Sequence, residues 1–231
     1  MTMKHTYLLP AFALLGLASG CAKEPAQEFK LSAEQLAWQP YRPGNILRFG
    51  QANSSKVRTF VIDDVEDKPE EYSLGGSAPV YLGPRKRVKS QSIEVRVRRT
   101  DTIRYSPTPT STPTRPDSIP DTSAHSLLSI SAGDIDQPGY AYLIWDYGFS
   151  SDLPYDDVIA GRPLSGFTLL LPMLRLGGID YTSVLRIPND PYLSGNPSGF
   201  PRNKPARFVY YAKGFGVVGF EEGNALWYRL P

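Results

Sequence analysis

The feature that most constrains the fold of this chain is the strict alternation of apolar and polar residues at positions 92–99 (SIEVRVRR). Ile93, Val95 and Val97 lie on one face of an extended chain, and charged side chains lie on the other. This period-two pattern is what a half-buried antiparallel strand requires. No segment after position 40 keeps a helical period for more than about ten residues, so a parallel sheet with crossover helices is not expected.

Comparable short segments recur along the rest of the chain. We expect further strands at residues 45–49, 56–62, 80–82, 127–130, 140–147, 167–176 and 183–187. Pro172 interrupts the longest of these apolar segments and predicts an edge strand, a bulge or a break at that point.

The C-terminal part has the most regular pattern. Residues 207–212, 216–220 and 226–230 predict a three-stranded meander with tight turns between the strands. The chain also contains 22 prolines, 20 glycines and 14 tyrosines, which is typical of turns and strands. We therefore predict an all-β fold, either an antiparallel β-sandwich or a strongly curved half-open β-barrel.

The first twenty residues have the form of a signal peptide. Lys4 supplies a positive charge, and the apolar run at residues 7–17 is shorter than the roughly 20 residues needed to span a bilayer. The following residues 18–21 (ASGC) resemble the lipobox of bacterial lipoproteins, although Leu17 stands four residues before Cys21 where that motif prefers three. The resemblance implies lipidation of Cys21 and removal of residues 1–20.

Two further observations bear on the fate of the mature chain. Cys21 is the only cysteine, so it has no intramolecular disulfide partner. Ala22 follows it, where an aspartate would suggest inner-membrane retention, and residues 22–24 resemble a surface-export signal of Bacteroidota lipoproteins. We expect anchoring in the outer membrane, on its periplasmic or cell-surface side. Ala18 and Gly20 also fit ordinary secretory cleavage, which leaves a secreted form as the alternative.

The mature chain divides into a tether and a domain. Residues 21–40 are predicted to be the tether, with one helical turn that begins at the capping-box sequence of residues 32–35 (SAEQ). Residues 41–231 are predicted to form a single all-β domain. Residues 106–124 are rich in proline, serine and threonine, and we expect them to form a disordered loop within it, with an interdomain linker as the alternative.

Three segments resemble uncharacterised outer-membrane lipoproteins of Bacteroidota. These segments are YRPGNILRF near the start of the domain, SVLRI in the middle and VYYAKGFGVVGFEEGNALWYRL at the end, where a YYAKGxG sequence opens the closing meander. The resemblance implies an all-β domain. It implies no activity and supplies no catalytic residue.

Groups that carry enzyme chemistry are scarce. His125 is the only histidine left after signal cleavage, and it lies beside the Pro/Thr-rich segment, where we expect an exposed loop. A catalytic triad or a zinc site is therefore not predicted, and no cofactor is expected. Carboxylates form three clusters, which we interpret as solvated loops, with a calcium site or a glycosidase pair as less favoured readings. The clusters are an acidic run between strands at residues 63–71, Asp134 with Asp136, and Asp152 with Asp156 and Asp157.

A basic stretch follows the acidic run. One interpretation is an anion-binding face, and the other is that the two stretches lie on neighbouring strands and neutralise each other, which we favour. The formal net charge of +2 gives no reason to expect a nucleic-acid partner. The residues of the candidate anion-binding face are Arg85, Lys86, Arg87, Arg96 and Arg98.

Two smaller features complete the prediction. The segments that contain Thr102 and Ser118 resemble the Asp-(Ser/Thr)-apolar acceptors of Bacteroidota O-glycosylation. Aromatic residues are dense in the second half, where we expect them mainly in the core, with stacking on glycans as the alternative.

We predict a non-enzymatic binding or structural module whose partner is an envelope protein, glycan or lipid. The alternatives are a carrier or chaperone of a hydrophobic ligand lined by residues 169–171 and, last, a hydrolase.

Overall fold

The computed structural model describes residues 25–74, 86–100, 103–105, 118–120, 124–146, 148–164, 166–190 and 206–231. These residues form fourteen strands and two short helices. In chain order they are β1 (Gln27–Phe29), α1 (Ala33–Leu36), β2 (Ile46–Gln51), β3 (Val57–Leu74), β4 (Lys86–Arg99), β5 (Ile103–Tyr105), β6 (Ser118–Pro120), β7 (His125–Ser131), β8 (Tyr140–Trp145), β9 (Phe149–Asp152), α2 (Tyr155–Ala160), β10 (Leu169–Leu176), β11 (Ile179–Pro188), β12 (Ala206–Ala212), β13 (Gly216–Glu222) and β14 (Ala225–Arg229).

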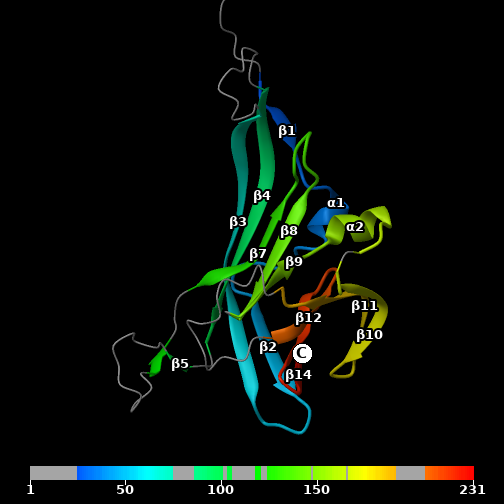
Figure 1. Cartoon of the computed structure of the whole chain (residues 1–231). Coiled ribbons are helices and arrows are strands. Elements are labelled where there is room, and N and C mark those ends of the chain that lie inside the picture. Colours follow the sequence, from blue (N-terminus) through cyan, green and yellow to red (C-terminus); the bar gives the residue numbers. More distant parts are fainter. Residues whose placement is uncertain are drawn as a thin grey trace, which may run out of the picture.

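Most of these strands belong to one curled antiparallel sheet that forms a half-barrel (Figure 1). The order is β10-β11-β12-β13-β14-β2-β3-β4-β7-β8-β9, and β1 pairs in parallel with β4 beyond the end of β7. The strands β5 and β6 pair separately. The prediction of an all-β, strongly curved half-open barrel is confirmed, and the sandwich alternative is not observed. The predicted strand at residues 80–82 and most of the Pro/Thr-rich segment lie outside the described residues.

The hairpin of β3 and β4 is much longer than the sequence pattern predicted. The expectation that the acidic residues 63–71 form a charge run between strands was wrong, because they are part of β3 and pair with β4. The physical reason is cross-strand charge pairing, which stabilises an otherwise polar strand. Arg98 reaches Asp63 at 3.2 Å, and Arg87 forms an ion pair with Glu71.

The concave face of the half-barrel is filled with aromatic side chains. The rings of Phe49 and Trp145 have centroids 5.2 Å apart, and the rings of Trp145 and Phe220 are 5.3 Å apart. Phe60 and Trp227 extend the same cluster and, like the others, are almost fully buried. Such edge-to-face and offset contacts add to the free energy gained by burying the rings. Trp145, Phe220 and Trp227 come from the aromatic-rich second half of the chain, and their burial agrees with the prediction that these aromatic residues lie mainly in the core.

A second, smaller apolar cluster lies on the opposite face of the sheet. It forms where the hairpin of β10 and β11 covers β13 and β14, and Leu176 at the end of β10 is one of its buried residues. The pairing of β11 with β12 ends at Val184, next to Ser183, whose φ is 52°. β10 lies at one edge of the sheet, which is one of the three alternatives that Pro172 predicted.

The N-terminal segment, residues 25–41, packs onto the sheet. The capping box at Ser32 is confirmed, with its hydroxyl accepting from the Gln35 amide while the Gln35 side chain accepts from the Ser32 amide. Trp38 is completely buried, and the Tyr211 hydroxyl donates to its carbonyl oxygen. Residues that the sequence assigned to the tether thus contribute to the core. Among the described residues, no helix has the length and apolar character needed to cross a membrane.

Candidate functional site

Several of the predicted site residues fall outside what the structure describes. This is the case for Cys21, Arg85 and Thr102, while Lys86 and Ser118 are described only as backbone within β4 and β6. The structure therefore places neither the lipidation site nor the candidate glycosylation side chains.

Two of the three described side chains of the candidate anion-binding face form ion pairs with acidic residues. Arg87 pairs with Glu71 and Arg98 with Asp63, and Arg96 lies opposite Asp64 in the strand register. Charges paired in this way attract external anions less than free ones do. This arrangement favours the second interpretation of the sequence, in which neighbouring strands neutralise each other.

His125 differs from its expected setting. It is the first residue of β7 and is half-buried rather than part of an exposed loop, because β7 pairs there with Val97 of β4. The strand begins earlier than the apolar run that predicted it.

Asp134 accepts hydrogen bonds that explain its position without a metal ion. One of its carboxylate oxygens accepts from the amides of Asp136 and Gln137, and the other accepts from the Tyr72 hydroxyl at 2.5 Å. The hydrogen bond from Tyr72 is the main reason that the pKa of Asp134 is lowered. Desolvation, followed by the bond to Asp134, raises the pKa of Tyr72 to about 12. Among the described residues, no group of three or more metal-binding side chains occurs.

Charged side chains also close one end of the aromatic core. Arg58 on β3 pairs with Glu222 and lies 3.6 Å from Asp146, which also accepts from Arg99 at 2.7 Å. The guanidinium group of Arg58 stacks on Trp227 at 4.1 Å from the ring centroid. Each of these charges has an opposite partner, so the cluster is best explained as a cap on the core.

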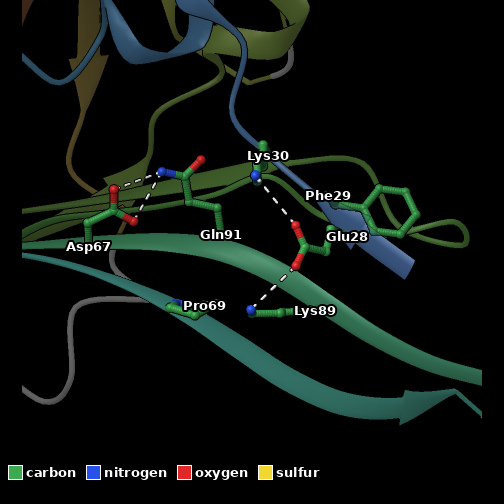
Figure 2. A pocket seen from close by; sticks show the side chains of 7 residues that line it. All are labelled: Glu28, Phe29, Lys30, Asp67, Pro69, Lys89 and Gln91. Atoms are coloured by element: carbon green, nitrogen blue, oxygen red, sulfur yellow. Dashed lines mark hydrogen bonds and ion pairs between the residues drawn. The ribbon is translucent and has the colours of Figure 1, made fainter. Parts of the chain in front are cut away.

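A first hollow, the N-terminal groove, lies between the N-terminal segment and the β3–β4 hairpin (Figure 2). Its volume is about 410 Å³. Its polar groups bind one another: Glu28 contacts Lys30 and Lys89, each at 3.4 Å, and the Gln91 amide donates to Asp67 at 2.9 and 3.0 Å. Gln91 also accepts from the Leu31 amide. These contacts hold the N-terminal segment in place and leave few groups for a ligand.

A second hollow, which we call the arginine pocket, has a volume of about 220 Å³ and different chemistry. It forms where β2, the start of β11, the β12–β13 turn and the C-terminal residues meet. Its lining combines two arginines with aliphatic and aromatic side chains and contains no acidic side chain. The lining residues are Ile46, Arg48, Ile179, Tyr181, Phe215, Arg229, Leu230 and Pro231.

The two arginines of the arginine pocket differ in how they are held: Arg48 is held only through its backbone, and Arg229 also through its side chain. The Leu230 amide donates to the Arg48 carbonyl at 2.7 Å, which holds the C-terminal residues beside β2. Arg229 donates from Nη1 to the Phe215 carbonyl at 2.6 Å. Arg48 is exposed, and its guanidinium group forms no hydrogen bond or ion pair within the part of the chain that the structure describes.

The aromatic wall of the arginine pocket comes from two distant segments. The rings of Tyr181 and Phe215 meet edge to face with centroids 5.2 Å apart. Burial raises the pKa of Tyr181, and the positive charge of Arg229 partly opposes this shift. The hydroxyl therefore stays neutral at physiological pH.

The sequence did not predict the arginine pocket. Its residues lie in segments separated by up to 185 positions, from Ile46 to Pro231, and no motif links them. One local signal was present, because Phe215 stands between two glycines in a turn, where an aromatic ring is not needed for the turn itself. That ring is 46% exposed.

Comparisons with known proteins add no identity to this description. No family model, no curated protein and no solved structure matches the chain.

Proposed function

We propose that this chain is a lipid-anchored protein of the outer membrane, attached through Cys21, whose half-barrel is a non-enzymatic binding module for an envelope partner. The observation that carries the proposal is the way the N-terminal segment joins the sheet. Gln27–Phe29 pair with β4 only six residues after Cys21, so the domain lies within about 20 Å of the anchored residue. A domain held this close is displayed at the bilayer.

The form of the domain supports binding at its surface over transport of a ligand in its interior. The concave face is occupied by contacting rings such as Phe49, Trp145 and Phe220, which is how a core is filled. Leu169 and Leu170, which a carrier would use as lining, are instead 51% and 42% exposed on the edge strand. A carrier of a hydrophobic ligand is therefore the weaker proposal.

Enzymatic function receives less support than binding. Two carboxylates at the end of the aromatic core, Asp146 and Glu222, are held in ion pairs with arginines.

The anchor is tested by replacing Cys21 with serine in the natural host. We expect loss of palmitate incorporation and release of the protein from the outer-membrane fraction, because each buried CH₂ of the acyl chains contributes about 0.8 kcal/mol to membrane binding. Ser19→Ala is the matched control, because it keeps a small residue before the cysteine and should leave lipidation unchanged. Recovery of wild-type protein from the culture fluid with an unmodified thiol at its first residue would contradict the proposal.

A second measurement separates the binding module from the carrier. Native mass spectrometry of the wild-type protein, released gently from membranes, should give the mass of the lipidated chain without a co-purified lipid. A stoichiometric bound lipid would favour the carrier instead.

A further inference from the structure

We propose that the arginine pocket is a binding site for a carboxylate carried on a small apolar group, such as a phenyl ring. This inference names the ligand class of the binding module and rests on that proposed function, but it does not depend on the lipid anchor. Its basis is the combination of an unused guanidinium group, exposed apolar side chains and a limited volume at one place.

The charge of the pocket selects an anion. Within the described residues Arg48 forms no side-chain hydrogen bond or ion pair, and Arg229 donates one N–H to the Phe215 carbonyl, so both arginines retain donors, and no lining residue has an acidic side chain. A guanidinium group offers planar, forked donors that match the two oxygens of a carboxylate. Most other arginines described here do not have this freedom, for example Arg58 and Arg99, which are paired with Asp146.

The apolar part of the pocket selects what carries the anion. Two large apolar side chains of the pocket are exposed to solvent: Ile46 on β2 is 59% exposed, and Phe215 in the β12–β13 turn is 46% exposed. Together with the buried Tyr181 they offer an apolar surface next to the arginines. Exposed apolar side chains around a concave site are typical of ligand binding.

The volume limits the size of the ligand. About 220 Å³ lies below the roughly 300–1,000 Å³ of pockets for drug-sized molecules, so one ring or branched chain with its carboxylate fits better than a larger molecule. This chemistry has two sources. One is a free small acid, and the other is the C-terminal residue of a peptide with an apolar side chain.

The test uses 3-phenylpropionate as the free acid and an N-acetylated tetrapeptide ending in phenylalanine as the peptide. Binding to the purified full chain is measured by calorimetry or by chemical-shift changes, at low and high salt. 3-Phenylpropanamide, which is neutral and of the same shape, is the ligand control. We expect binding of at least one carboxylate, weakening at high salt, and no binding of the amide.

Variants connect the binding to the pocket. Arg48→Gln should weaken binding at least about tenfold, because a charge-assisted pair to a carboxylate is lost. Arg162→Gln removes an exposed guanidinium group at the end of α2 and should change nothing. Phe215→Ala, which alters an exposed side chain and leaves the turn backbone in place, should weaken binding of both carboxylates.

The outcomes separate the sources and the proposals. Tighter binding of the peptide assigns the site to a polypeptide terminus, and tighter binding of the free acid assigns it to a small metabolite. Absence of binding by both, equal binding of the amide, or equal weakening by Arg162→Gln overturns the assignment. A carrier function would appear separately, as a co-purified lipid that the Arg48→Gln variant retains.

Discussion

At the scale of single residues, the β12–β13 turn depends on one glycine. Gly216 has φ of 78°, a conformation that favours glycine, and a Cβ atom there would collide with the Tyr41 hydroxyl. That hydroxyl accepts from the Val217 amide at 2.8 Å, and burial raises the pKa of Tyr41 to about 12. The hydrogen bond to Tyr41 therefore holds the backbone next to the turn that contains Phe215.

Gly216→Ala is expected to destabilise the protein by about 3 kcal/mol or more, because backbone strain and overpacking against Tyr41 add. Gly214→Ala is the matched control: its φ is 79°, yet a Cβ atom there meets open space, so it should cost only about 1 kcal/mol. Chemical denaturation of both variants measures the difference. Equal losses of stability would show that Tyr41 does not restrict the turn.

At the scale of elements, the hairpin of β10 and β11 has two unlike surfaces. One side covers β13 and β14 through buried residues such as Leu176, which a Cβ atom on Gly219 would contact. The other side is exposed and apolar: Met173 is 67% exposed. A strand that looks uniformly apolar in sequence therefore contributes to stability on one side only.

Leu176→Ala is expected to lower the free energy of unfolding by about 2–3 kcal/mol, because it opens a cavity in the second apolar cluster. Met173→Ala, on the same strand, should cost less than about 0.5 kcal/mol, since its side chain is mostly in solvent. Thermal or urea unfolding distinguishes them. Similar effects of the two substitutions would mean that the hairpin does not pack over β13 and β14 as described.

At the scale of the whole molecule, the fold separates β1, which follows the proposed anchor in the chain, from the arginine pocket. β1 lies beside the far part of the β3–β4 hairpin, whereas the C-terminal end lies beside β14 in the other half of the molecule (Figure 1). Between Val57 and Ser73, β3 alone spans about 50 Å. A chain anchored at Cys21 would therefore hold the β3–β4 hairpin near the bilayer and the β2–β3 turn away from it.

This orientation predicts different distances from the bilayer for two labels. Cys21 is the only cysteine in the sequence, and the proposed lipidation would block its thiol, so a new cysteine would then be a unique labelling site. In vesicles with acceptor lipids labelled at the headgroup, energy transfer should be high from Arg87→Cys, which adjoins the β1 pairing, and low from Ser54→Cys in the β2–β3 turn. Equal transfer from the two sites would contradict the orientation while leaving the anchor itself untouched.

Much of the fold followed from the sequence because it depends on local patterns. Alternation at residues 92–99, the capping box at Ser32 and the glycine turns of the C-terminal meander each specify structure within a few residues. The acidic part of β3 escaped prediction because its stability comes from arginines and lysines on β4, and a polar strand has no apolar alternation of its own. The strand β1 escaped for the same reason, since its partner lies about sixty residues away.

The sequence by itself determined the all-β class, the strands that show apolar alternation and the candidate anchor at Cys21, because each depends on a pattern in neighbouring residues. Only the tertiary structure decided that the sheet curls into a half-barrel with a filled concave face, and that Ile46, Arg48, Tyr181, Phe215 and Arg229 meet in one pocket. The reason is that sheet closure and surface pockets arise from contacts between segments far apart in the chain, and no local pattern records them.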